Sequence, residues 1–127
     1  MDTYVRFQTQ LRCGWTGRPA GLFLAAGRLE DSGRLTPSVR ELLGEHLTWF
    51  NRNLVVPSLG DRGWRCVFWF RSEATEFIGR MWDLVAILNE EGVSVQKRWT
   101  TEPGKIVYGD DYQIGAVPSP SSNALRV

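Results

Sequence analysis

The residues with the most obvious chemical potential form a short acidic turn. Gly109, Asp110 and Asp111 separate two short apolar runs, and paired aspartates on a hairpin can hold the metal ions that position phosphates. That chemistry needs a further aspartate on an adjacent strand, and neither 4–11 nor 64–70 contains one. Glycine and aspartate are also ordinary hairpin residues because they tolerate a positive φ. The sequence therefore predicts a turn here, with no metal site and no cofactor.

A second candidate is the glycine-rich run at 13–21, which links a predicted strand to a predicted helix. Backbone N–H groups and the helix dipole converge at such a junction and can bind an anion. Gly14, Gly17 and Arg18 are the residues that would hold it. The run matches neither common glycine pattern for phosphate binding, and a loop alone explains its glycines. An anion-binding or nucleotide-binding protein, or an enzyme using this loop, is the alternative hypothesis.

The single histidine offers little for catalysis. His46 lies on the apolar stripe of a predicted helix, near Glu41 and Glu45. A half-buried, hydrogen-bonded structural histidine is the expectation. No serine or cysteine at a fixed spacing suggests a catalytic triad, and two cysteines without a Cys-x-x-Cys pair argue against zinc. The sequence favours a protein that is not an enzyme and leaves the question open.

The composition is that of one globular domain. The 127 residues are 43% hydrophobic and 23% charged, with a net charge of +1. No apolar run approaches the roughly 18 residues that span a membrane, and the N-terminus has no signal pattern, so we expect a cytoplasmic protein. The small net charge disfavours nucleic-acid binding driven by bulk charge. Residues 3–29 nevertheless hold four arginines and no acid, which keeps nucleic acid as a further alternative.

Hydrophobic periodicity predicts eight elements in the order β-α-α-β-α-β-β-β. Thr36 and Pro37 provide a strong helix start, and Gly92 is the expected end of the third helix. The run at 64–70 is apolar on both sides, which is typical of a central strand. The predicted strands cover 4–11, 64–70, 93–99, 105–108 and 112–117, and the predicted helices run from about 19, 36 and 72.

These elements predict an α+β fold, a two-layer sandwich. Its sheet is expected to be mixed and about five-stranded, with three helices on one face. The segment 64–99 should be a right-handed parallel crossover, and the last three strands should form an antiparallel meander. A single domain is expected over 1–117, followed by a disordered tail over 118–127.

Several segments resemble a set of small, uncharacterised bacterial single-domain proteins. They include YVRFQTQ, L-T-W-F-N, F-W-F-R-S-x-A, R-M-W-D-L-V-A-I-L and G-x-I-V-Y-x-D-x-Y-Q, and the resemblance extends over about residues 4–118. It implies a free-standing bacterial domain. It implies no activity, and it assigns no functional residue.

Tryptophan and arginine are both abundant, with six tryptophans and thirteen of the fifteen basic residues as arginine. If alternate strand residues point into the core, the opposite sheet face carries aromatic and basic side chains and no acid. Such a face can stack against a partner. We therefore predict binding through this face to a protein partner or to a second copy in a homodimer. The alternative is that the C-terminal tail or the final hairpin covers Trp69. The predicted binding residues are Tyr4, Arg6, Arg65, Trp69, Arg71 and Arg98.

Overall fold

The computed structural model describes residues 2–12, 19–59 and 66–118. Contacts between residues divide the chain into two compact units. Unit 1 comprises Met1–Arg6, Pro57–Ile78 and Lys97–Val127, and unit 2 comprises Phe7–Val56 and Gly79–Gln96. The prediction of one domain over 1–117 stays a prediction, and the predicted tail lies outside the described residues from 119 onward.

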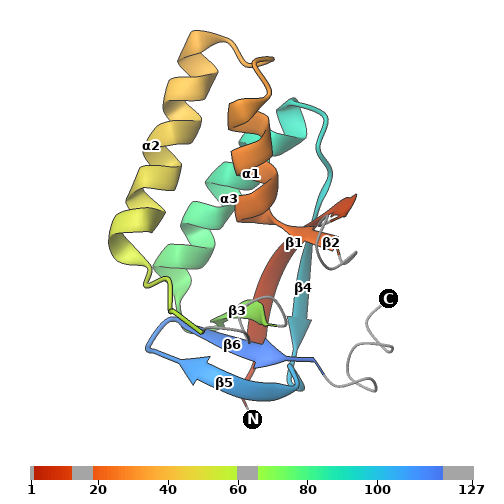
Figure 1. Cartoon of the computed structure of the whole chain (residues 1–127), viewed down its shortest axis with the longest axis vertical. Coiled ribbons are helices and arrows are strands. Elements are labelled where there is room, and N and C mark those ends of the chain that lie inside the picture. Colours follow the sequence, from red (N-terminus) through yellow and green to blue (C-terminus); the bar gives the residue numbers. More distant parts are fainter. Residues whose placement is uncertain (1, 13–18, 60–65, 119–127) are drawn as a thin grey trace. The chain divides into compact units, whose positions relative to one another are not determined.

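The described residues form three helices and six strands (Figure 1). The α+β class and the predicted order of elements are confirmed, with one short strand, β2, added. Strand β1, helix α3 and strand β4 each continue from one unit into the other. The elements are β1 (Tyr4–Arg12), β2 (Pro19–Gly21), α1 (Leu22–Asp31), α2 (Pro37–Asn53), β3 (Val67–Arg71), α3 (Thr75–Glu90), β4 (Val95–Thr100), β5 (Lys105–Gly109) and β6 (Gln113–Val117).

The strands of unit 1 are hydrogen-bonded in the order β1-β3-β6-β5. Tyr4 pairs with Arg71 across β1 and β3, and Trp69 pairs with Ile114 across β3 and β6. These pairs and the β5–β6 pair are antiparallel, as is β1 with β2 in unit 2. The sheet is therefore antiparallel wherever its register is defined, and the expectation of a mixed sheet is corrected.

One predicted strand partnership is wrong. The predicted meander is reduced to the β5–β6 hairpin, since β4 pairs with β1 and not with β5. The segment predicted as a crossover contains β3, α3 and β4, and β1 lies between the two strands because it pairs with both of them. A local turn signal gives the position of a bend but does not determine which distant strand completes the hydrogen bonds.

Strand β3 is central in unit 1, as its sequence predicts. Phe70 projects from one face and stacks on Phe77 at the start of α3, with ring centroids 6.0 Å apart. Phe77 in turn lies 4.6 Å from the ring of Tyr112. On the other face, Trp69 packs against a buried cluster of Tyr4, Ile114 and Ala116. Both faces of β3 are therefore packed.

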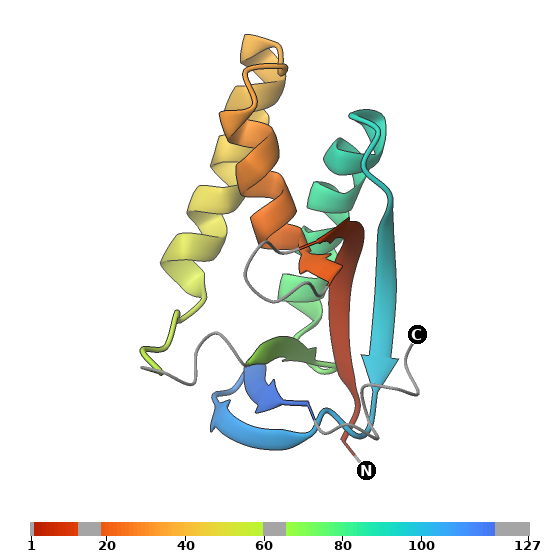
Figure 2. The ribbon, with the colours of Figure 1, turned by 45° about the vertical axis from the view of Figure 1, so that its right-hand side comes forward.

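Unit 2 is built around its helices. Helices α1 and α2 lie side by side (Figures 1 and 2), and the Phe23 ring lies 4.9 Å from that of Phe50. On β1, Phe7 makes an edge-to-face contact with Trp82 of α3 at 5.0 Å. The buried apolar side chains of the helices in this unit are Leu22, Ala25, Ala26, Leu29, Leu43, Phe50, Met81, Leu84, Val85, Ile87 and Leu88.

Two local signals behave as predicted, and one does not. The Thr36 hydroxyl accepts a hydrogen bond from the N–H of Val39, which caps α2. Gly92 ends the third helix region with φ +85°. The first helix, however, starts at Leu22 and not at Pro19, because residues 19–21 are extended and pair with β1 as β2.

Among the described glycines, we expect Gly104, in the turn between β4 and β5, to be the most sensitive to substitution. Gly104 has φ +107°, and a Cβ there would overlap the carbonyl oxygen of Val117 and lie 2.8 Å from the Pro118 Cα. Gly104→Ala should lower the free energy of unfolding by about 2 kcal/mol or more. Gly92→Ala is the control, since its position is open, and it should cost about 1 kcal/mol. Equal losses in denaturant titrations would contradict this expectation.

Candidate functional site

The predicted sheet-face residues that are described all belong to unit 1. Tyr4 lies opposite Arg71, so the alternation of the antiparallel pair puts Arg6 opposite Trp69 on the same face. Arg98 is half-buried on β4. The predicted Arg65 lies outside the described residues, as do Gly14, Gly17 and Arg18 of the predicted anion loop.

This face is packed and does not form an open aromatic surface. Tyr4 is only 5% exposed, and Ile114 and Ala116 on β6 are fully buried against it. Trp69 is half-buried, and its indole N–H is buried without a hydrogen-bond partner among the described residues. The expectation of an exposed Tyr4 is therefore corrected. The pleat correctly predicts the composition of this face, but it carries no information on what packs over it.

Two arginines of this face donate to backbone carbonyls. Arg6 Nη1 donates to the Phe68 carbonyl at 3.3 Å, and Arg71 Nε donates to the Asp110 carbonyl at 2.7 Å. Both side chains are half-buried. These contacts connect β1 to β3 and β3 to the β5–β6 turn, so each arginine has a structural role in unit 1.

The acidic turn is a hairpin turn held by Asp110. One carboxylate oxygen, Oδ1, accepts hydrogen bonds from the N–H of Tyr112 at 2.8 Å and of Gln113 at 2.9 Å. The other, Oδ2, accepts from the Tyr108 hydroxyl at 2.6 Å. Within the described ranges, no group of three or more His, Cys, Asp or Glu side chains could hold a metal ion. The aspartate is used to close the turn.

These hydrogen bonds displace two pKa values in opposite directions. Burial acts to raise the pKa of Asp110, but the hydrogen bonds from Tyr108, Tyr112 and Gln113 outweigh it, and the pKa lies below its usual 3.8. The pKa of Tyr108 lies above its usual 10.0, chiefly because its hydroxyl donates to Asp110. The bond is therefore strongest when Asp110 is charged and Tyr108 is neutral.

His46 is half-buried on α2, as predicted. Its Nδ1 is buried and has no hydrogen-bond partner in the part of the chain that the structure describes. The expected hydrogen bond is therefore not formed at this nitrogen.

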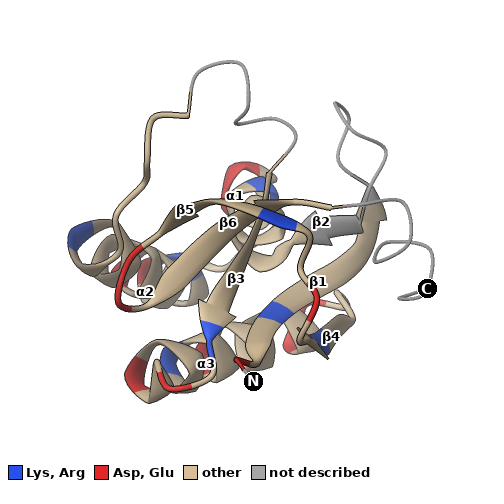
Figure 3. Ribbon diagram, turned by 90° about the horizontal axis from the view of Figure 1, so that it is seen from below, with Lys and Arg blue, Asp and Glu red and all other residues tan. Residues whose placement is uncertain are grey.

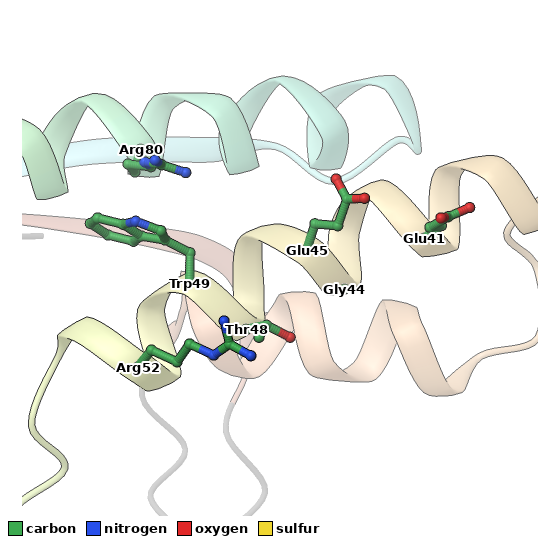
Figure 4. A pocket seen from close by; sticks show the side chains of 7 residues that line it. All are labelled: Glu41, Gly44, Glu45, Thr48, Trp49, Arg52 and Arg80. Atoms are coloured by element: carbon green, nitrogen blue, oxygen red, sulfur yellow. The ribbon is translucent and has the colours of Figure 1, made fainter.

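An open groove of about 500 Å³ runs along the outer side of α2 in unit 2 (Figure 4). Within it, the Arg80 guanidinium carbon of α3 lies 4.2 Å from the centroid of the Trp49 ring. The two side chains face each other from neighbouring helices, and such a cation–π contact contributes about 0.5–1 kcal/mol at an exposed site. The residues lining the groove are Glu41, Gly44, Glu45, Thr48, Trp49, Arg52 and Arg80.

The groove is charged with both signs, and the two signs are separated along α2. Both occur on this helix in Figure 3. Glu41 lies in its second turn and Glu45 at its midpoint, Arg52 lies in its last turn, and Thr48 lies between Glu45 and Arg52. All four side chains are exposed. The groove therefore presents an acidic part and a basic part beside one aromatic ring.

This groove is not among the sites predicted from the sequence. Trp49 lies beside the apolar stripe of its helix, which predicts a packing residue, and the Trp49–Arg80 contact joins helices that are far apart in the chain. The sequence feature that could have indicated the groove is the polar stripe on α2. Charged residues recur there four and eleven positions after Glu41.

The chain matches no known protein family, no curated protein and no solved structure. No described helix is long and apolar enough to cross a membrane.

The turn network predicts a stability difference that depends on pH. Tyr108→Phe removes the donor to Asp110 and should destabilise the protein at neutral pH. The lowered Asp110 pKa means that the stabilisation is present above pH 3.8 and is lost as the pH falls through the lowered value. The raised Tyr108 pKa means that it is present below pH 10.0 and is lost at higher pH. Tyr112→Phe is the control. A wild-type minus Tyr108→Phe difference that is constant from acid to alkaline pH would refute this account.

Proposed function

We propose that this protein acts by binding a protein partner, through the groove on the outer side of α2. The observation that carries the proposal is the contact of Arg80 with the Trp49 ring in an open groove lined by both signs of charge. Tryptophan and arginine are the residues most enriched at the energetic centres of protein interfaces.

The stacked pair favours binding because it is already ordered. Arg80 and Trp49 hold each other in place at 4.2 Å, so a partner has less side-chain entropy to remove on association. The exposed charged residues around them supply the polar rim that surrounds the apolar centre of a typical interface. Small-molecule substrates, by contrast, are usually enclosed in concave pockets, whereas Glu41, Glu45 and Arg52 are all exposed.

The groove supports the proposal better than the sheet face of unit 1 does. There, Tyr4 is 5% exposed, and the arginines Arg6 and Arg71 bind backbone carbonyls. A bacterial origin and a cytoplasmic location are compatible with a small binding protein and remain predictions from the sequence.

Site-specific crosslinking tests the proposal whatever the identity of the partner. A photoreactive amino acid at Thr48, which lines the groove, should form discrete adducts in cells of the source organism. The same amino acid at Asn89, exposed on α3, should not. Trp49→Ala or Arg80→Ala should abolish the Thr48 adducts, because either change removes half of the stacked pair.

Arg80→Met keeps the packing of the side-chain stem and separates loss of binding from loss of folding. The proposal fails if Thr48 gives no adduct, if Asn89 gives the same adducts, or if the adducts persist in the Trp49→Ala and Arg80→Met variants while circular dichroism shows them folded.

A further inference from the structure

The polar face of α2 has an unusual order of charge. Residues four, seven and eleven positions after Glu41 fall on the same side of a helix, and they are Glu45, Thr48 and Arg52. All four are exposed, and all four line the groove. The stripe is about 16 Å long. It is negative over its first half and positive at its end.

The helix dipole does not account for this order. Acidic residues are favoured in the first turn of a helix, where the dipole acts, yet the first turn of α2 contains none. Glu41 and Glu45 lie beyond that turn. Arg52 in the last turn does suit the dipole. The dipole therefore does not account for the positions of the two glutamates.

We propose that this stripe binds the same stripe of a second copy of this chain, with the two α2 helices antiparallel. This inference rests on the proposed function and names its partner. Glu45 faces the partner's Arg52, and by symmetry Arg52 faces the partner's Glu45. The two-fold axis passes between Thr48 and Trp49, and the partner's Glu41 adds negative potential toward Arg52.

Charge complementarity selects both the partner and the orientation. A stripe that is negative at one end and positive at the other complements itself only when it is reversed, because a parallel arrangement opposes like charges. An antiparallel pair is isologous and closes as a dimer. A helix–helix contact of this length is a small interface of the transient type.

Charge reversal with rescue is the decisive experiment. Light scattering over a concentration series should show wild-type protein rising from the 14.4 kDa monomer toward the dimer. Glu45→Arg and Arg52→Glu should each remain monomeric, because each creates two like-charged contacts. The dimer dissociation constant should rise by about tenfold or more. An equal mixture of the two variants should dimerise again, since one stripe is then positive and the other negative.

Matched controls separate this effect from a general effect of net charge. Glu90→Arg and Arg34→Glu make the same changes at exposed positions of unit 2 outside the groove, and they should dimerise as the wild type does. Raising the salt concentration should weaken the wild-type dimer. Circular dichroism verifies that every variant is folded.

The outcomes distinguish this inference from the proposed function. A wild-type chain that stays monomeric, with a foreign protein crosslinked at Thr48, overturns self-association and leaves the proposed function standing. The antiparallel arrangement is overturned if the two charge reversals do not weaken the dimer. It is also overturned if the single variants are monomeric and their equal mixture does not dimerise. A monomeric wild type with no adduct at Thr48 overturns both.

Discussion

The double pairing of β3 is the constraint on which the rest of unit 1 depends. Hydrogen bonds to β1 on one edge and to β6 on the other fix the register, and the pleat then assigns every side chain to one face. Phe70 lies against Phe77, and Trp69 packs with Tyr4 and its buried neighbours. A strand that is paired on both edges and packed on both faces has few exposed groups left for a partner.

What the sequence could predict in this chain was local. The Thr36 cap needs only a hydroxyl and the backbone three residues later, and a C-terminal glycine needs only its positive φ. The central position of β3 was also readable, because a run that is apolar on both sides can be satisfied only inside a sheet. Asp110 as a turn residue follows from the same short-range chemistry.

The remaining features depend on contacts between residues far apart in the chain. No property of 95–100 shows that β4 should pair with β1 and not with β5. The arginine count did not distinguish Arg71, which binds the Asp110 carbonyl, from Arg80, which stacks on Trp49. The side of a strand or helix that stays exposed depends on what packs over the other side, and periodicity reports only that the sides differ.

The tryptophans also show that the environment of a residue depends on contacts with distant parts of the chain. Trp69 is held in a packed face, and Trp82 contacts Phe7 although it is 47% exposed. Trp49 differs because a cation lies over its ring. The guanidinium adds positive charge beside the aromatic surface, next to a stripe whose glutamates and arginine are already separated along α2. An apolar ring alone would favour any apolar partner. A ring beside acidic and basic side chains that are separated along a helix favours a partner whose charges run in the opposite order.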